Sequence, residues 1–213
     1  MIVTRYIADM IYQKMYEKII SSFYGILTVV LPIAGLIAAI FLHGVQEDIG
    51  YKIVAYLFFI ELVMIWLQNV FLSALKDYKR IVRGFTIGII ISIVVSFLLF
   101  KFLSIDPTIN TLAGIDVGFA VIVGMSMYHF ERVFPRDEKR YYFAFLSYLK
   151  KYPSIFFSGL FVYSGVYIHN FVYWIFSDRH FTIANHFVWM PFYDVPVFYA
   201  YISVLPSLVM FVV

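Results

Sequence analysis

The sequence predicts an all-α fold, a polytopic transmembrane helical bundle with six spans. Of the 213 residues, 63% are hydrophobic and 14% are charged, whereas a soluble domain carries about 25% charged residues. The apolar residues are gathered into runs of about 20, the length that a helix needs to cross a bilayer. Lysine and arginine concentrate in every second segment between the runs, unlike the spread of charge over a face that binds nucleic acid, so we predict no nucleic-acid partner.

Residues 1–19 are predicted to be a cytoplasmic amphipathic segment. Ile7, Met10, Ile11 and Met15 can share one face of a helix while the basic residues stay in water. We expect this helix to lie on the membrane surface, either as a plain juxtamembrane element or with a role in gating.

The first four spans are predicted at about 20–42, 53–75, 84–102 and 112–130. Small residues recur every four positions in the third and fourth, a pattern that allows close helix packing. These residues are Gly84, Gly88, Ser92 and Ser96, with Gly114 and Gly118. Asp116 is expected to be interfacial, near the end of the fourth span.

Polar side chains mark the second span. Glu61 and Gln68 are seven residues apart and so lie on nearly the same face, with Asn69 one residue further round. An unpartnered carboxyl group in the hydrocarbon region costs on the order of 3 kcal/mol. Glu61 should therefore face another helix, in a packing hydrogen bond, or a cavity, as a pathway or ion-coupling residue.

Residues 131–153 form the most charged segment and are predicted to be a basic cytoplasmic linker between two groups of spans. Tyr142, Phe145, Leu146 and Leu149 follow the spacing of a helix that lies on a surface. Two further spans are predicted at about 154–176 and 195–213. Because the chain stops inside an apolar run, we expect it to be a truncated piece of a longer protein.

The fifth span combines aromatic and polar residues with no charged side chain. His169 and Asn170 stand side by side, and a stripe of aromatic rings includes Tyr167 and Trp174. Such a stripe can stack on sugar rings, although packing against lipid or protein is the more common explanation.

Lysine and arginine also predict the orientation. Their numbers in the successive segments outside the spans are three, one, four, one, six and one. By the positive-inside rule the N-terminal segment is cytoplasmic, together with residues 76–83 and 131–153. A missed span would break this alternation.

Motifs of soluble and metal-dependent catalysis are absent from the sequence. It has no cysteine, no P-loop and no GxSxG motif, and its five histidines form neither an HExxH nor an HxxxH pair. We therefore predict no metal, no cofactor and no enzymatic activity.

Four stretches resemble the PelG family, the inner-membrane exporters of Pel exopolysaccharide. They are residues 4–9 (TRYIAD), 71–79 (FLSALKDYK), 159–174 (GLFVYSGVYIHNFVYW) and 193–206 (YD leading to FYAYISVLP). The resemblance implies a branch of the multidrug/oligosaccharidyl-lipid/polysaccharide flippase superfamily, with about twelve helices in two lobes around a cavity. This chain would hold the last four helices of the first lobe, the inter-lobe linker and two helices of the second. His169-Asn170 departs from the acidic–basic pair expected there.

The resemblance implies export of an amino-sugar polymer across the bacterial inner membrane, with membrane partner subunits and a cytoplasmic glycosyltransferase. The candidates for the transport pathway are Glu61, Gln68, Asn69, Tyr167, His169, Asn170 and Trp174. The candidates for contact with cytoplasmic partners or membrane lipid are Arg5, Lys79, Arg136, Lys139, Arg140, Lys150 and Lys151. Two alternatives stay open: a flippase of lipid-linked oligosaccharides or drugs, and a membrane scaffold or embedded acyl-transfer enzyme that uses His169 and Asp194.

Overall fold

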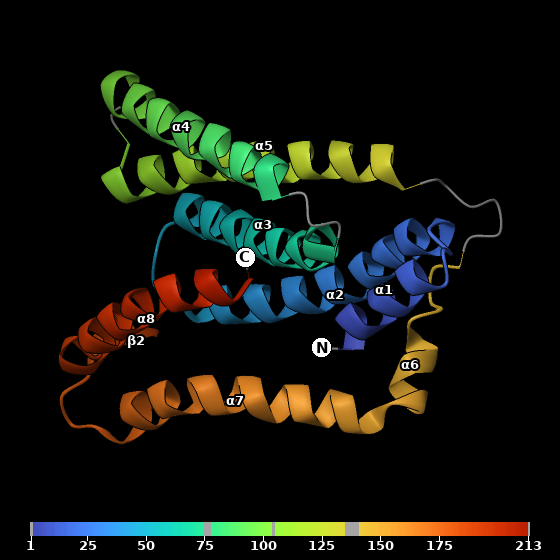
Figure 1. Cartoon of the computed structure of the whole chain (residues 1–213). Helices are drawn as coiled ribbons and strands as arrows, with labels where there is room; N and C mark the ends of the chain where they lie inside the picture. Colours follow the sequence, from blue (N-terminus) through green and yellow to red (C-terminus); the bar gives the residue numbers. More distant parts are fainter. Residues whose placement is uncertain (1, 75–77, 104, 135–140, 213) are drawn as a thin grey trace. The chain divides into compact units, whose positions relative to one another are not determined.

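A computed structural model describes residues 2–74, 78–103, 105–134 and 141–212, with the side chains of Ala74 and residues 205–212 excepted. Within this part the chain forms helices and one short β-hairpin (Figure 1). It divides into two compact units. Unit 1 comprises residues 1–43 and 47–157, and unit 2 comprises residues 44–46 and 158–213.

Unit 1 begins with a short amphipathic helix and a long apolar helix, and the boundary between them is earlier than the predicted residue 19. Helix α1 (Ile2–Tyr12) ends before a turn in which Lys14 has a φ of 58°, and α2 (Glu17–Gly44) follows. A left-handed residue cannot continue a right-handed helix, so the chain changes direction here. The predicted face of α1 forms, since Ile7 and Met10 are buried, but it packs on the core of unit 1.

Helices α3 (Ile49–Ala74), α4 (Tyr78–Phe102) and α5 (Pro107–Val133) complete the bundle of unit 1. The side chain of Asp106 accepts a hydrogen bond from the Thr108 amide at 2.7 Å, which caps α5 and lowers the pKa of Asp106. Pro107 occupies the first turn, where its missing N–H costs nothing. Helix α5 therefore starts five residues before the predicted span.

The small residues of α4 and α5 bring the two helices together, as predicted, and these helices lie side by side in Figure 1. The Ser92 hydroxyl donates to the Gly114 carbonyl oxygen at 3.0 Å. A Cβ atom at Gly118 would lie 2.5 Å from the carbonyl oxygen of Gly88. Gly84 is the exception, because a Cβ atom there would meet nothing within 4 Å.

The apolar core of unit 1 is concentrated at one end of its helices. The ring of Phe23, near the start of α2, lies 5.1 Å from the ring of Phe71 and 4.8 Å from the ring of Phe130, which are near the ends of α3 and α5. At the other end, α2 and α3 line an open hollow of about 390 Å³, with residues such as Leu42 and Ile53 on its surface.

The segment after α5 contains a shorter helix than the spacing predicted. Helix α6 (Leu146–Lys151) has six residues. Phe145 is buried in the core of unit 1, but Tyr142 and Leu146 are exposed, so the predicted apolar face forms only in part. The carbonyl oxygen of Tyr142 occupies the space beside Gly25 of α2.

Unit 2 contains α7 (Pro153–Phe176) from residue 158 onward, a hairpin and α8 (Pro191–Val212). Between the helices, where the sequence predicted no element, β1 (Phe181–Ile183) and β2 (Phe187–Trp189) pair antiparallel. Ala184 and Asn185 adopt positive φ angles in the turn. The Asn185 amide also donates to Gln46 Oε1 at 2.6 Å, which attaches residues 44–46 to this unit.

Five helices are long and apolar enough to cross a membrane: α2, residues 49–73 of α3, α4, α5 and α7. The chain is therefore an all-α polytopic bundle. Helix α8 covers the sixth predicted span and starts four residues before it, but it is not among these five helices in the part of the chain that the structure describes. The number six stays a prediction.

Candidate functional site

Two clusters of polar side chains stand out in the spans, one in each unit. In unit 1, Gln68 of α3 is only 3% exposed, and its Nε2 donates to the Val123 carbonyl oxygen of α5 at 3.1 Å. Its Oε1 has no hydrogen-bond partner among the described residues. A buried amide that is half satisfied still has an acceptor to offer.

The register of α3 and α5 places a second pair of polar groups at one level. These helices run parallel because one helix separates them in the chain, and Gln68 and Val123 are 55 residues apart. Seven residues earlier on each helix stand Glu61 and Asp116, again 55 residues apart. Seven residues are about two turns, so the two carboxyl groups lie on the facing sides of the helices and interact electrostatically.

Asp116 is buried inside unit 1, whereas the sequence placed it near the end of its span. It stands in the third turn of α5 and is 7% exposed. It lies further from the start of the helix than predicted because α5 begins at Pro107 instead of residue 112. Both oxygens of Asp116, and Oε2 of Glu61, are buried without a hydrogen-bond partner among the described residues. Two carboxyl groups in this state require a proton, a cation, water or a polar solute.

Asn69 is not part of the cluster formed by Glu61, Gln68 and Asp116. It follows Gln68 on α3 and so points about 100° away around the helix axis. Its side chain is half-buried. We keep it as a candidate for the pathway on sequence grounds alone.

In unit 2, His169 of α7 is the centre of a hydrogen-bonded group of aromatic residues from α8. Its Nδ1 lies 2.7 Å from the Tyr193 hydroxyl, and its Nε2 lies 3.5 Å from the Tyr201 hydroxyl. The ring of Tyr193 stacks on Tyr173 with 3.8 Å between the ring centroids. A neutral imidazole has one donor and one acceptor, so it can bridge two hydroxyls.

Trp174 lies in the same unit and is held by a carboxylate. Its Nε1 donates to Asp194 Oδ1 at 3.0 Å and to Oδ2 at 3.1 Å. Asp194 Oδ2 also accepts from the Met190 amide at 2.8 Å, at the start of α8. These three bonds give Asp194 a structural explanation and leave little reason to assign it to acyl transfer.

The remaining candidates on α7 differ from each other in burial. Asn170 Oδ1 is buried without a hydrogen-bond partner among the described residues, whereas Tyr167 is half exposed. The aromatic stripe is likewise exposed, except at Trp174, whose ring lies 5.5 Å from that of Phe171. The structure thus brings His169 and Trp174 to α8 and leaves Tyr167 open to an external ring.

Of the basic candidates, Arg5, Lys150 and Lys151 lie outside the five apolar helices, and Lys79 is in the first turn of α4. Arg5 forms an ion pair with Asp9 at 3.2 Å, and its guanidinium lies 5.9 Å from the centroid of the Tyr152 ring. Lys151 lies 5.1 Å from the centroid of the same ring, while Lys79 and Lys150 are exposed. Arg136, Lys139 and Arg140 lie outside the described residues.

Aromatic residues of α6 connect this basic region to α1. The Tyr148 ring meets Tyr6 edge-on at 5.1 Å. Burial, together with a hydrogen bond to Asp9, raises the pKa of Tyr148 to about 12. The spacing in 142–149 identified the element but not this contact, which depends on the turn at Lys14.

Five helices that are long and apolar enough to cross a membrane, with buried polar groups in the bundle, indicate a multi-pass membrane protein. Within that class, the family model of PelG, described as "Putative exopolysaccharide Exporter (EPS-E)", matches residues 1–213. The chain therefore belongs to the PelG family, which is a family of exporters and not of enzymes. No curated protein and no solved structure matches it.

Proposed function

We propose that this protein forms part of the route by which an amino-sugar polymer of the Pel type leaves the bacterial cytoplasm through the inner membrane. The observation that carries the proposal is the match of the whole chain to the PelG family. The distribution of lysine and arginine supports a cytoplasmic N-terminal segment. The alternative is a flippase of lipid-linked oligosaccharides or drugs, which would move single molecules instead of a polymer.

The polar cluster of unit 1 suits contact with a sugar polymer. Glu61, Gln68 and Asp116 present oxygens that are buried and lack hydrogen-bond partners among the described residues. The hydroxyl, amide and amine groups of an amino sugar can donate hydrogen bonds to these oxygens. Because a polymer slides, each contact should be weak and repeated along the route, as two levels of acceptors two turns apart would provide.

The aromatic groups of unit 2 suit the apolar faces of sugar rings. Tyr167 is exposed and free to stack, whereas Trp174 is fixed in orientation by Asp194. His169 can exchange its weak 3.5 Å contact with Tyr201 for a sugar hydroxyl while it keeps Tyr193. Asn170 would supply one further amide oxygen.

Partners are proposed on the cytoplasmic side. A glycosyltransferase must deliver the growing chain, and membrane partner subunits would hold it there. The exposed residues Lys79 and Lys150 are available to such partners or to anionic lipid. Arg5 could exchange its ion pair with Asp9 for an acidic group of such a partner or lipid.

The test is complementation of a deletion strain with the full-length gene, followed by assay of secreted and cell-retained amino-sugar polymer. Glu61→Gln and Asp116→Asn keep the shape of the side chain and remove the carboxylate. Loss of one charge-assisted hydrogen bond should lower secretion by roughly tenfold. Glu47→Gln is the matched control, because Glu47 is exposed outside the spans and should leave secretion unchanged.

Three outcomes separate the readings. Reduced secretion by the variants of Glu61 and Asp116, with precursor accumulating in the cell, supports polymer export through the cluster. Full secretion by both variants would show that the two carboxylates are not part of the transport route and serve in helix packing instead. Unchanged secretion in the deletion strain itself contradicts polymer export and favours the flippase or a non-transporting scaffold.

A further inference from the structure

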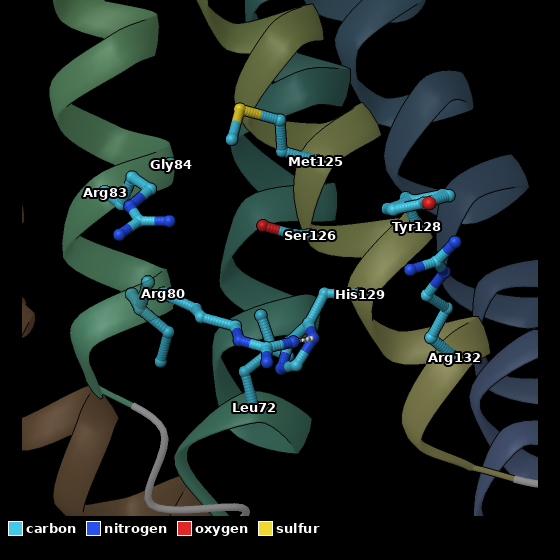
Figure 2. Close-up of a pocket in the computed structure, with 10 residues that line it drawn as sticks. Leu72, Arg80, Arg83, Gly84, Met125, Ser126, Tyr128, His129 and Arg132 are labelled. Atoms are coloured by element: carbon cyan, nitrogen blue, oxygen red, sulfur yellow. Dashed lines mark hydrogen bonds between the residues drawn. The ribbon is translucent and has the colours of Figure 1, made fainter.

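A pocket of about 290 Å³ in unit 1, between the start of α4 and the end of α5, is explained by contacts among its own lining residues. Figure 2 shows Arg80 extending from α4 toward His129 of α5, and Nη1 of Arg80 lies 2.7 Å from Nδ1 of His129. The guanidinium of Arg132 lies 4.6 Å from the centroid of the Tyr128 ring. Gly84 lines the open part of the pocket. These contacts belong to the packing of α4 against α5.

The β-hairpin of unit 2 carries four large apolar side chains on one face. Directly paired residues point to the same side of a sheet, and so do residues two apart on one strand. The register of β1 and β2 therefore places four residues together: Phe181, paired with Trp189, and Ile183, paired with Phe187. The opposite face has Thr182 and Val188. We call the side with the four residues the apolar face of the hairpin.

Much of the apolar face is exposed. Phe181 is 56% exposed, Ile183 52% and Trp189 44%. The sheet has two strands, and no third strand pairs with it in the part of the chain that the structure describes. A hairpin of two strands alone is marginally stable in water, and burial of its apolar side chains against another apolar surface lowers their free energy. The apolar face therefore needs an apolar partner.

The chain holds the hairpin close to the ends of membrane-spanning helices. Helix α7 ends at Phe176 and β1 begins at Phe181, so roughly 18 Å is the longest distance that this connection can cover. At the tip, the Gln46 amide donates to the Ala184 carbonyl oxygen at 3.1 Å, beside the hydrogen bond from Asn185 to Gln46. Gln46 follows the last residue of α2, another of the five apolar helices, by two positions. The base and the tip of the hairpin are thus both tied to residues at the membrane boundary.

The apolar face continues a set of aromatic side chains at this boundary. Phe176 is the last residue of α7 and Phe192 is the second residue of α8, and both are strongly exposed. Aromatic residues at the ends of spans gather at the interface between membrane and water. The hairpin joins these two residues along the chain and adds further rings at the same depth. The indole of Trp189, an apolar ring with one N–H donor, is typical of this interface.

The exported polymer is a less suitable occupant of this face than lipid. Binding sites for polar small molecules and sugars combine an apolar surface with several polar groups that fix orientation. The four side chains of the apolar face contain one polar atom, the indole nitrogen of Trp189. The glycerol and acyl carbons of a phospholipid need no such partners, so lipid can cover the face without leaving polar groups unpaired.

We propose that the hairpin is an interfacial anchor whose apolar face lies against the lipid of the membrane, at the boundary between headgroups and acyl chains. The distribution of lysine and arginine predicts that this is the external leaflet. The anchor fixes the depth of the connection between α7 and α8. The proposal does not depend on the nature of the exported solute.

The test uses the full-length protein in liposomes of phosphatidylethanolamine and phosphatidylglycerol, with one nitroxide spin label on an introduced cysteine. This chain has no cysteine, and any other in the full-length protein is replaced by serine. Phe181→Cys and Ile183→Cys place the label on the apolar face. Thr182→Cys and Val188→Cys are matched controls on the opposite face of the same strands. Collisions of the label with oxygen, which enters lipid, and with a water-soluble nickel chelate report its surroundings.

The ratio of oxygen to nickel collisions should be severalfold higher at residues 181 and 183 than at residues 182 and 188, so it alternates along β1. A ratio that does not alternate overturns the proposal. Frequent nickel collisions on both faces would show that water or polymer reaches the apolar face, and exclusion of both reagents from residues 181 and 183 would show that protein covers it.

A second measurement applies if the labelled variants do not fold. Tryptophan fluorescence of the unlabelled protein is quenched by lipid that is brominated near the glycerol, and the wild type is compared with Trp189→Phe. Trp189→Phe should lose part of the quenching, because this indole lies at the depth of the bromine atoms. Equal fractional quenching in both proteins overturns the proposal.

Discussion

Gly118 offers the most direct test of the packing of α4 against α5. We consider Gly118→Ala, which adds one methyl group to α5. Its Cβ would lie 2.5 Å from the Gly88 carbonyl oxygen and 2.8 Å from the side chain of Ser92, where an ordinary contact begins at 3.4 Å. The nearest atom belongs to the backbone, so no side chain can rotate away. The helices must separate by about 1 Å, which weakens every contact between them.

The change in the free energy of unfolding depends on two opposing effects, the overpacking of the helix contact and the better helix propensity of alanine. Overpacking typically costs about 1–3 kcal/mol, and the forced separation of α4 and α5 places this change at about 3 kcal/mol. Gly124→Ala is the matched control on the same helix, because its Cβ would meet nothing within 4 Å. There the better helix propensity of alanine should stabilise the protein by about 0.5–1 kcal/mol.

Thermal unfolding of the purified full chain in detergent measures this difference. At about 2–4 °C per kcal/mol for a chain of this length, Gly118→Ala should melt roughly 10 °C below Gly124→Ala. If the two variants melt within about 2 °C of each other, the close approach of α4 and α5 is wrong. The register that brings Arg80 to His129 would then lose its basis.

Two further predictions concern unit 2 and the contact of α6 with α1. A double-mutant cycle of Trp174→Phe and Asp194→Asn should give a coupling energy of about 1.5 kcal/mol in thermal unfolding, and a value near zero would contradict their hydrogen bonds. Tyr148 has a folded pKa of about 12 against an ordinary 10.0, so the folded state holds its proton more tightly. Its contribution to stability should be complete below pH 10 and be lost as the pH rises toward 12; Tyr148→Phe should lack this part of the pH profile, and identical profiles would refute the contact.

The sequence was sufficient to predict those features that depend on one helix at a time. Runs of apolar residues located the spans because a helix needs about 20 of them to cross a bilayer. The four-residue repeat of Gly88 and Ser92 identified a contact surface because residues four apart lie on one face of a helix. The same repeat failed at Gly84, because a small residue can open a pocket as well as a helix contact, and the sequence does not distinguish them.

Features that depend on two distant helices could not be predicted. Glu61 was selected for its cost in lipid, but its pairing with Asp116 depends on the register of α3 against α5. The capped start of α5 lies more than a turn before the predicted one, so Asp116 is further from the beginning of its helix than the sequence indicated. The hairpin was missed for a local reason: its turn uses Ala184 and Asn185 in place of the glycine that usually marks such a turn.

The uneven packing of α2 against α3 has a mechanical consequence. The rings of Phe23 and Phe71 pack together at one end of this helix pair, whereas both helices line an open hollow of about 390 Å³ at the other end. Segments with few buried contacts deform at lower free energy than a close-packed core. We therefore expect α2 and α3 to move relative to each other more easily at the end with the hollow than at the end held by the aromatic rings.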